Sequence, residues 1–123
     1  MKSQNASFLS KFFLKFKYSF EGLVDGLLHD FSIQLQFGLG LIAILVAAAL
    51  KFTDIEWCIW IICISQVIGM EYINSSIESI IDRFDPSWNI LIKQAKDLGS
   101  AAVLLSALLA GVVGFILIAR HLL

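Results

Sequence analysis

Three runs without a charged side chain limit what this chain can fold into. They cover residues 31–50, 57–70 and 98–119. A helix needs roughly 20 apolar residues to cross a bilayer core of about 30 Å. The first and third runs are long enough alone, and the second is long enough as part of one helix, since the only proline of the chain is Pro86. The prediction is an all-α membrane protein with membrane helices at 31–50, 55–83 and 97–119.

The composition agrees with a membrane protein and excludes other classes. Hydrophobic residues make up 59% of the chain and charged residues 15%, and the mean hydropathy is +0.85. Soluble domains are about 45–50% apolar and about 25% charged, and disordered chains contain still fewer apolar residues. The net charge of −1 provides no basic surface for nucleic acid. With 123 residues, the chain is predicted to form one domain over residues 1–123.

The segment before the first run is predicted to form an amphipathic surface helix over about residues 6–29. Phenylalanine recurs at every fourth residue, and two lysines lie on the opposite arc; these residues are Phe8, Phe12, Phe16, Phe20, Lys11 and Lys15. Such a helix lies in the membrane interface with its apolar face in the lipid. An ordinary helix that packs on the bundle is the alternative, because Lys17 lies near the edge of the apolar face.

Basic residues predict the orientation of the helices, because Lys and Arg accumulate on the cytoplasmic side of a membrane. Most of them lie before the first span or between the second and third: Lys2, Lys11, Lys15, Lys17, Arg83, Lys93 and Lys96. Lys51 and Arg120 lie at the opposite ends of the spans. We therefore expect the N-terminus and the connection between the second and third spans to be cytoplasmic, and the C-terminus to lie outside.

A polar stripe near the end of the second predicted span is the main candidate for a functional site. Glu71, Asn74, Glu78 and Asp82 fall within an arc of roughly 80° at about 100° per helical residue. Three carboxylates on one stripe beside a bilayer repel one another and resist desolvation. A bound Mg²⁺ would compensate for this charge, because Mg²⁺ prefers hard oxygen ligands. The alternative is a helix end whose carboxylates simply face the cytoplasm.

Lys96 and Asp97 open the third predicted span, which places a cation and exposed backbone N–H groups at a helix start. This arrangement favours phosphate. With the carboxylate stripe at the same membrane depth, it predicts phosphoryl transfer between a nucleotide on the water side and an acceptor in the membrane. The sequence contains neither a P-loop nor a Gly-x-Gly-x-x-Gly motif.

Taken together, these motifs resemble those of a known family. Residues 71–82 have the form Glu-x-x-Asn-Ser-x-Ile-Glu-x-x-x-Asp, and residues 95–103 read Ala-Lys-Asp-x-Gly-Ser-Ala-Ala-Val. With the opening Phe-Lys-Tyr-Ser-Phe-x-Gly at 16–22, they resemble the prokaryotic diacylglycerol kinase and undecaprenol kinase family of small membrane lipid kinases. The resemblance extends over about residues 16–115. It implies a homotrimer of three-span subunits, each with a surface helix, whose shared sites bind MgATP without a P-loop.

The resemblance also implies roles for individual residues. Glu71 corresponds to the catalytic base, and Asp30 and Glu78 correspond to ligands of Mg²⁺. The residues implied to bind ATP are Tyr18, Asp30, Glu78, Asp82, Lys96 and Asp97. Asn74, Lys11 and Trp88 are implied to support the site or the substrate. The sequence departs from the family at two places: Asp30 stands where a glutamate is usual, and the loop at 87–89 lacks the histidine that commonly follows its aromatic residue.

The expected function is ATP-dependent phosphorylation of the hydroxyl of a membrane lipid alcohol, undecaprenol or diacylglycerol. The resemblance places it at the cytoplasmic face of the bacterial inner membrane. Three alternatives remain open from the sequence. The chain could be a small transporter or channel subunit with Glu71 as its coupling carboxylate, a catalytically inactive paralogue, or an assembly protein without chemistry.

Overall fold

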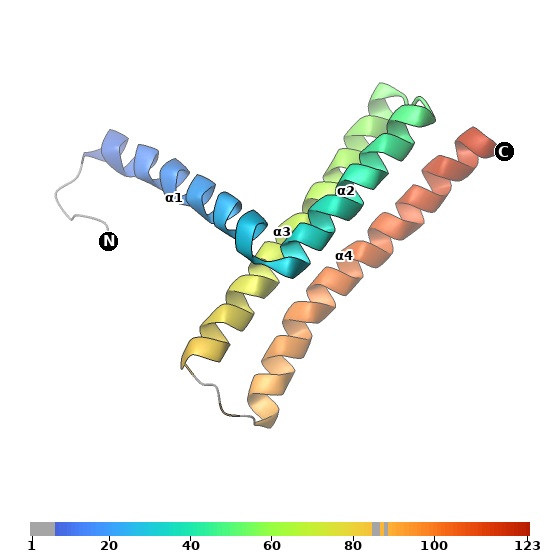
Figure 1. Cartoon of the computed structure of the whole chain (residues 1–123). Coiled ribbons are helices and arrows are strands. Elements are labelled where there is room, and N and C mark those ends of the chain that lie inside the picture. The colour runs from blue at the N-terminus through green and yellow to red at the C-terminus, as the bar shows by residue number, and fades with distance from the viewer. Residues whose placement is uncertain (1–6, 85–86, 88) are drawn as a thin grey trace.

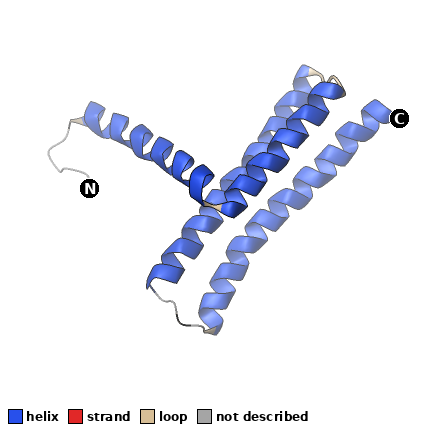
Figure 2. Cartoon of the chain, in the orientation of Figure 1, coloured by secondary structure: helices blue, strands red, loops and turns tan. Residues whose placement is uncertain are grey.

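The computed structural model describes residues 7–84, 87 and 89–123, and the regular structure of these residues is entirely helical (Figure 2). Four helices follow one another along the chain: α1 (Phe8–His29), α2 (Phe31–Ala49), α3 (Asp54–Phe84) and α4 (Ile90–Leu122). The last three are long and apolar enough to cross a membrane. The predicted all-α class is therefore confirmed. Three helices are long and apolar enough to span a membrane, and one helix precedes them.

Helix α3 is the centre of the arrangement, because α2 and α4 both pack on it. Helix α1 projects away from the other three at a steep angle, and its junction with α2 lies beside the middle of α3 (Figure 1). The lower halves of α3 and α4 consequently continue past the start of α2 and are joined beyond it. At 1.5 Å per residue, the 19 residues of α2 span about 28 Å and the 31 residues of α3 about 46 Å. Only part of α3 therefore fits within a bilayer core of about 30 Å.

The end of the bundle opposite the α3–α4 connection contains a small aromatic core. Ala47, Phe52, Trp60 and Leu117 are buried together there. A Schellman turn ends α2 at this point, with Phe52 N–H donating to the Ala47 carbonyl at 3.1 Å and Lys51 N–H to the Ala48 carbonyl at 3.2 Å. Lys51 adopts the left-handed conformation that this turn requires, with φ of 56°. The turn directs Phe52 back onto α2 and α4.

Helix α1 has no buried residue, and most of its large apolar side chains are exposed. Its described contact with α3 lies near its C-terminal end, where the Tyr72 hydroxyl donates to the Leu23 carbonyl at 2.7 Å. Gly26 makes this approach possible, because a Cβ there would lie 2.5 Å from the Tyr72 ring. Helix α1 therefore does not pack along its length on the bundle, and its placement on a membrane surface stays a prediction.

The start of α4 differs from the sequence prediction. The helix begins at Ile90, not at residue 97, because the Asn89 side chain caps it by accepting from the backbone N–H groups of Leu91 and Ile92 at 3.0 Å. Lys96 and Asp97 therefore lie inside the helix, where backbone N–H groups are already bonded to preceding carbonyls. The predicted placement of these two residues at a helix start was wrong. Any phosphate contact at this point must come from their side chains.

Candidate functional site

The predicted stripe on α3 runs from the buried middle of the molecule to its exposed end. Glu71 and Asn74 are each 6% exposed. Glu78 is half-buried and Asp82 is exposed. The stripe therefore passes from a dry environment beside α2 to water near the α3–α4 connection. Such a gradient suits a site that must reach both a membrane substrate and a soluble one.

Glu71 meets a single hydrogen-bond donor in the described part of the chain. Gln36, in the second turn of α2, donates from Nε2 to Glu71 Oε2 at 3.4 Å. Polar groups this deeply buried normally have partners, so one long bond leaves acceptor capacity on the carboxylate unused. Sequence analysis had not assigned Gln36 to the site, although an amide within an apolar span was a signal that could have found it.

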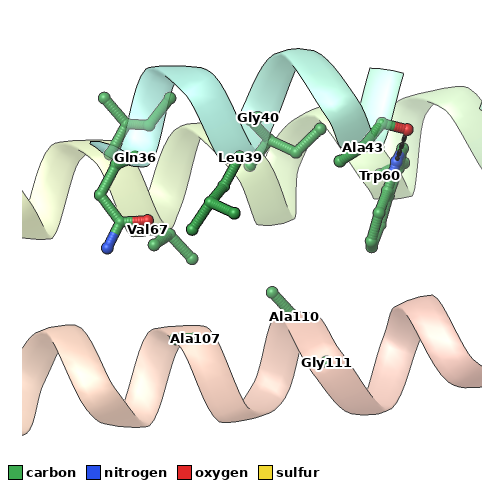
Figure 3. A pocket seen from close by; sticks show the side chains of 11 residues that line it. Gln36, Leu39, Gly40, Ala43, Trp60, Val67, Ala107, Ala110 and Gly111 are labelled. Atoms are coloured by element: carbon green, nitrogen blue, oxygen red, sulfur yellow. Dashed lines mark hydrogen bonds between the residues drawn. The ribbon is translucent and has the colours of Figure 1, made fainter. Parts of the chain in front are cut away.

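An apolar groove of about 210 Å³ begins beside Gln36 and continues away from the stripe, between α2 and α3 on one side and α4 on the other (Figure 3). Small residues of α4, including Ala107, Ala110 and Gly111, form one wall. At the far end, the Trp60 indole N–H donates to the Ala43 carbonyl at 2.9 Å. Gln36 therefore connects this apolar space to the Glu71 carboxylate, to which it donates.

Asn74 connects the buried and the half-buried part of the stripe. Its Nδ2 donates to Glu78 Oε1 at 3.3 Å, one helical turn further along α3. Its Oδ1 is buried and has no hydrogen-bond partner within the described residues. Gly99 of α4 lies against this oxygen. Burying an amide oxygen without a partner is unfavourable, so Asn74 is an unusual residue at this depth of the helix pair.

One lysine side chain of α4, that of Lys96, reaches the exposed end of the stripe. Lys96 Nζ lies 2.5 Å from Asp82 Oδ1, which links α4 to α3. Asp97 instead pairs with Lys93 of its own helix at 2.6 Å. The structure thus brings Lys96 to the stripe, whereas the described ion pair of Asp97 lies on α4 itself.

Asp30 lies at the junction of α1 and α2, where it caps α2. Its Oδ1 accepts from the Ile33 backbone N–H at 3.0 Å. Asp30 also faces a polar groove of about 500 Å³ between α1 and α3. The other polar residues that line this groove are Ser19, Asp25, His29, Tyr72, Ser75, Ser76 and Ser79. Asp30 and the stripe residue Glu78 therefore belong to different parts of one chain's surface.

The remaining predicted residues are not gathered at the stripe. Lys11 and Tyr18 are exposed on α1, the helix that projects from the bundle. Trp88 lies outside the described residues.

The oxygen atoms of the stripe suit Mg²⁺ bound together with a nucleotide. Among residues 7–84, 87 and 89–123, no group of three His, Cys, Asp or Glu side chains is placed to hold a metal ion. Mg²⁺ seldom uses such a cage, because it is usually bound by one or two carboxylates and by substrate phosphates. Glu78 provides one carboxylate of this kind. Asn74 bonds to its Oε1, and its Oε2 takes no part in that bond. The donor set therefore fits Mg²⁺ that arrives with ATP.

The fold and the stripe define a small multi-pass membrane protein with an acidic site at one end of its spans. Residues 17–118 match the family described as prokaryotic diacylglycerol kinase, and the chain belongs to this family. It is therefore a lipid kinase, as the sequence motifs predicted, and the family assignment does not favour the alternative of a transporter or channel subunit.

Curated relatives of the chain bear two different names. A diacylglycerol kinase of Escherichia coli (strain K12) is 31% identical over 104 residues, which cover 85% of each chain. A diacylglycerol kinase of Helicobacter pylori is 33% identical over 88 residues, covering 72% of this chain and 69% of the relative. An undecaprenol kinase of Bacillus subtilis is 23% identical over 109 residues, covering 89% of each. Relatives named for either lipid therefore align with most of this chain.

Proposed function

We propose that this protein transfers the γ-phosphoryl group of ATP to the hydroxyl of a membrane lipid alcohol at the cytoplasmic face of the bacterial inner membrane. The observation that carries the proposal is the position of Glu71. Glu71 is 6% exposed, and its carboxylate accepts one long hydrogen bond, from Gln36, which lines the apolar groove. A lipid hydroxyl can enter this environment from the membrane, and a soluble acceptor would have to be desolvated first.

In the proposed reaction, Glu71 takes the proton of the lipid hydroxyl as its oxygen attacks the γ-phosphorus. A new P–O bond forms to the lipid, the bond between the γ-phosphorus and the β–γ bridging oxygen breaks, and ADP leaves with that oxygen. The free acceptor capacity of the Glu71 carboxylate supports its role as the base. Replacing this group by an amide removes the base and keeps the side-chain size.

The exposed part of the stripe is proposed to bind the nucleotide. Lys96 would contact the phosphates, and Asp82 would hold the ammonium in place through their 2.5 Å contact. Glu78, oriented by Asn74, and Asp30 would hold Mg²⁺, which neutralises charge on the phosphate oxygens when bound. Tyr18 and Asp97 are proposed as further ATP contacts, and Lys11 and Trp88 as supporting residues.

We further propose that the active unit is a homotrimer with sites shared between neighbouring subunits. Asp30 lies at the α1–α2 junction and Glu78 on α3. In the proposed trimer, a neighbouring subunit would supply the second carboxylate beside Glu78. The concentration of basic residues around the N-terminus and the α3–α4 connection supports a cytoplasmic location of both.

The lipid is either undecaprenol or diacylglycerol, since named relatives of both kinds align over most of the chain. Transfer of label from γ-labelled ATP in mixed micelles with Mg²⁺, offering each lipid in a separate reaction, tests the function and its substrate together. We expect label in one lipid, and at least about a hundredfold less with Glu71→Gln. Asp54→Asn, an exposed carboxylate at the opposite end of α3, is the matched control. No transfer to either lipid by folded trimer would support the inactive paralogue.

A further inference from the structure

The orientation of the Asn74 amide is fixed by the group that it faces on α3. A carboxylate oxygen only accepts hydrogen bonds, so the Asn74 atom that lies 3.3 Å from Glu78 Oε1 must be the nitrogen. The opposite orientation would place the amide oxygen against the carboxylate oxygen. Oδ1 must therefore point toward α4, where it has no hydrogen-bond partner among the described residues.

Gly99 is the residue of α4 that provides room for this oxygen. It is buried, and a Cβ built on it would approach Asn74 Oδ1 well inside the 3.0 Å below which real Cβ contacts essentially never fall. The same Cβ would lie 3.5 Å from Asn74 Cγ. Any side chain at this position would therefore displace the amide or separate the two helices.

Other glycines of α4 do not have this relationship to the stripe. A Cβ on Gly111 would meet nothing within 4 Å, and a Cβ on Gly114 would lie 2.7 Å from the Trp60 ring at the opposite end of the bundle. A requirement for close packing of α3 and α4 explains Gly114. At Gly99, the group that needs the space is a polar side chain bonded to a stripe carboxylate.

We propose that Gly99 is a positioning residue for phosphoryl transfer, because the space beside its Cα admits the Asn74 amide in the orientation that bonds to Glu78. This inference rests on the proposed function, in which Glu78 and Asn74 form part of the site for Mg²⁺ and ATP. Residues that orient a metal ligand typically change metal affinity or activity about 10- to 100-fold when they are replaced. Gly99→Ala should therefore weaken magnesium-dependent nucleotide binding by about tenfold or more.

The test is equilibrium binding of a fluorescent, non-hydrolysable ATP analogue to the detergent-solubilised protein, titrated with Mg²⁺. Wild type is compared with Gly99→Ala, Asn74→Ala and the double variant. If Gly99 acts through Asn74, the two substitutions are not additive, and the double variant binds like Asn74→Ala alone. The double variant also removes the steric conflict, so it decides the question even where Gly99→Ala does not fold.

Two variants of α4 serve as controls for the binding measurement. Gly111→Ala introduces a methyl group into open space and should bind the analogue as wild type does. Gly114→Ala disturbs the packing of Trp60, so it should lower the melting temperature without a comparable loss of nucleotide binding. Stability and binding are thereby separated on the same helix.

The outcomes distinguish the inference from the proposed function. If Asn74→Ala weakens binding while Gly99→Ala binds like wild type, the inference is overturned and the function stands. A double variant that binds more weakly than Asn74→Ala also overturns it, since Gly99 would then act by another route. If Asn74→Ala itself binds like wild type, the assignment of Asn74 to the nucleotide site fails, and the inference fails with it.

Discussion

The ammonium group of Lys96 lies 2.5 Å from the carboxylate of Asp82 and thereby joins α4 to α3 at the open end of the site. The two side chains are 36% and 64% exposed, respectively. Ion pairs between exposed side chains contribute little to stability, because water screens the charges and two long side chains lose freedom. The pair therefore matters more for where it holds the cation than for how strongly it holds the helices together.

Lys96→Met should impair catalysis far more than stability. Loss of a charged hydrogen bond to a phosphate lowers kcat/KM for MgATP by roughly 10- to 100-fold. The melting temperature in detergent should change by no more than a degree or two, because the pair is exposed. Lys93→Met is the matched control, since Lys93 pairs with Asp97 on the same helix. Equal losses of kcat/KM in both variants would contradict a specific role for Lys96.

Asp30 should have two separable roles, as a helix cap and as a charge. Asn caps a helix as well as Asp does, so Asp30→Asn should keep the bond from the Ile33 N–H and leave stability unchanged. Asp30→Ala should cost about 1 kcal/mol of stability through loss of the cap. Both variants should raise the Mg²⁺ concentration for half-maximal activity by about tenfold or more, if Asp30 is a metal ligand. A normal Mg²⁺ titration with Asp30→Asn would remove Asp30 from the metal site.

If Asp30 has both roles, they would account for an aspartate at a position where the resemblance implies a glutamate. The short side chain of Asp reaches the N–H groups of the first helical turn, whereas that of Glu is a poorer cap. With Oδ1 bonded to Ile33, Oδ2 is the oxygen left for a cation. Asp30→Glu should therefore retain Mg²⁺ dependence while it lowers the stability of α2.

The sequence predicted those features that depend on local pattern. Charge-free runs predicted the spanning helices, and a 100° rotation per residue placed Glu71 and Asn74 on one face of α3. The start of α4 was missed, because the side-chain bond of Asn89 begins the helix before the charge-free run does. Contacts between helices were also missed. Neither the bond from Gln36 to Glu71 nor the approach of Gly99 to Asn74 follows from spacing along one helix.

Gln36→Leu should lower kcat without a large change in KM for MgATP. Leucine fits the apolar groove beside this position and removes the hydrogen bond to Glu71. A net contribution of about 0.5–1.5 kcal/mol per hydrogen bond corresponds to a decrease of about two- to twelvefold. Steady-state kinetics with the lipid substrate in mixed micelles measures both constants. Gln34→Leu is the control, because that side chain bonds to backbone carbonyls of α1 and not to Glu71.

The pair of Glu56 and His121 should stabilise the opposite end of the bundle without affecting catalysis. Glu56 is 5% exposed, and its Oε2 lies 2.7 Å from His121 Nε2. The same oxygen accepts from the Thr53 N–H at 2.8 Å, and the His121 ring stacks on Phe52 with 5.2 Å between centroids. The contacts join the start of α3 to the end of α4, at the end of the bundle away from the α3–α4 connection (Figure 1).

His121→Leu removes one partner and leaves the Glu56 carboxylate buried, which is strongly unfavourable. We expect the melting temperature in detergent to fall by several degrees, while kcat and KM of the folded enzyme stay at wild-type values. Replacing both residues by leucine should recover much of the loss, because an apolar pair avoids the buried charge. A double variant less stable than His121→Leu alone would show that the capping bonds of Glu56 to Thr53 outweigh the cost of its buried charge. Arg120→Gln, next to His121 and exposed, controls for charge at the end of α4.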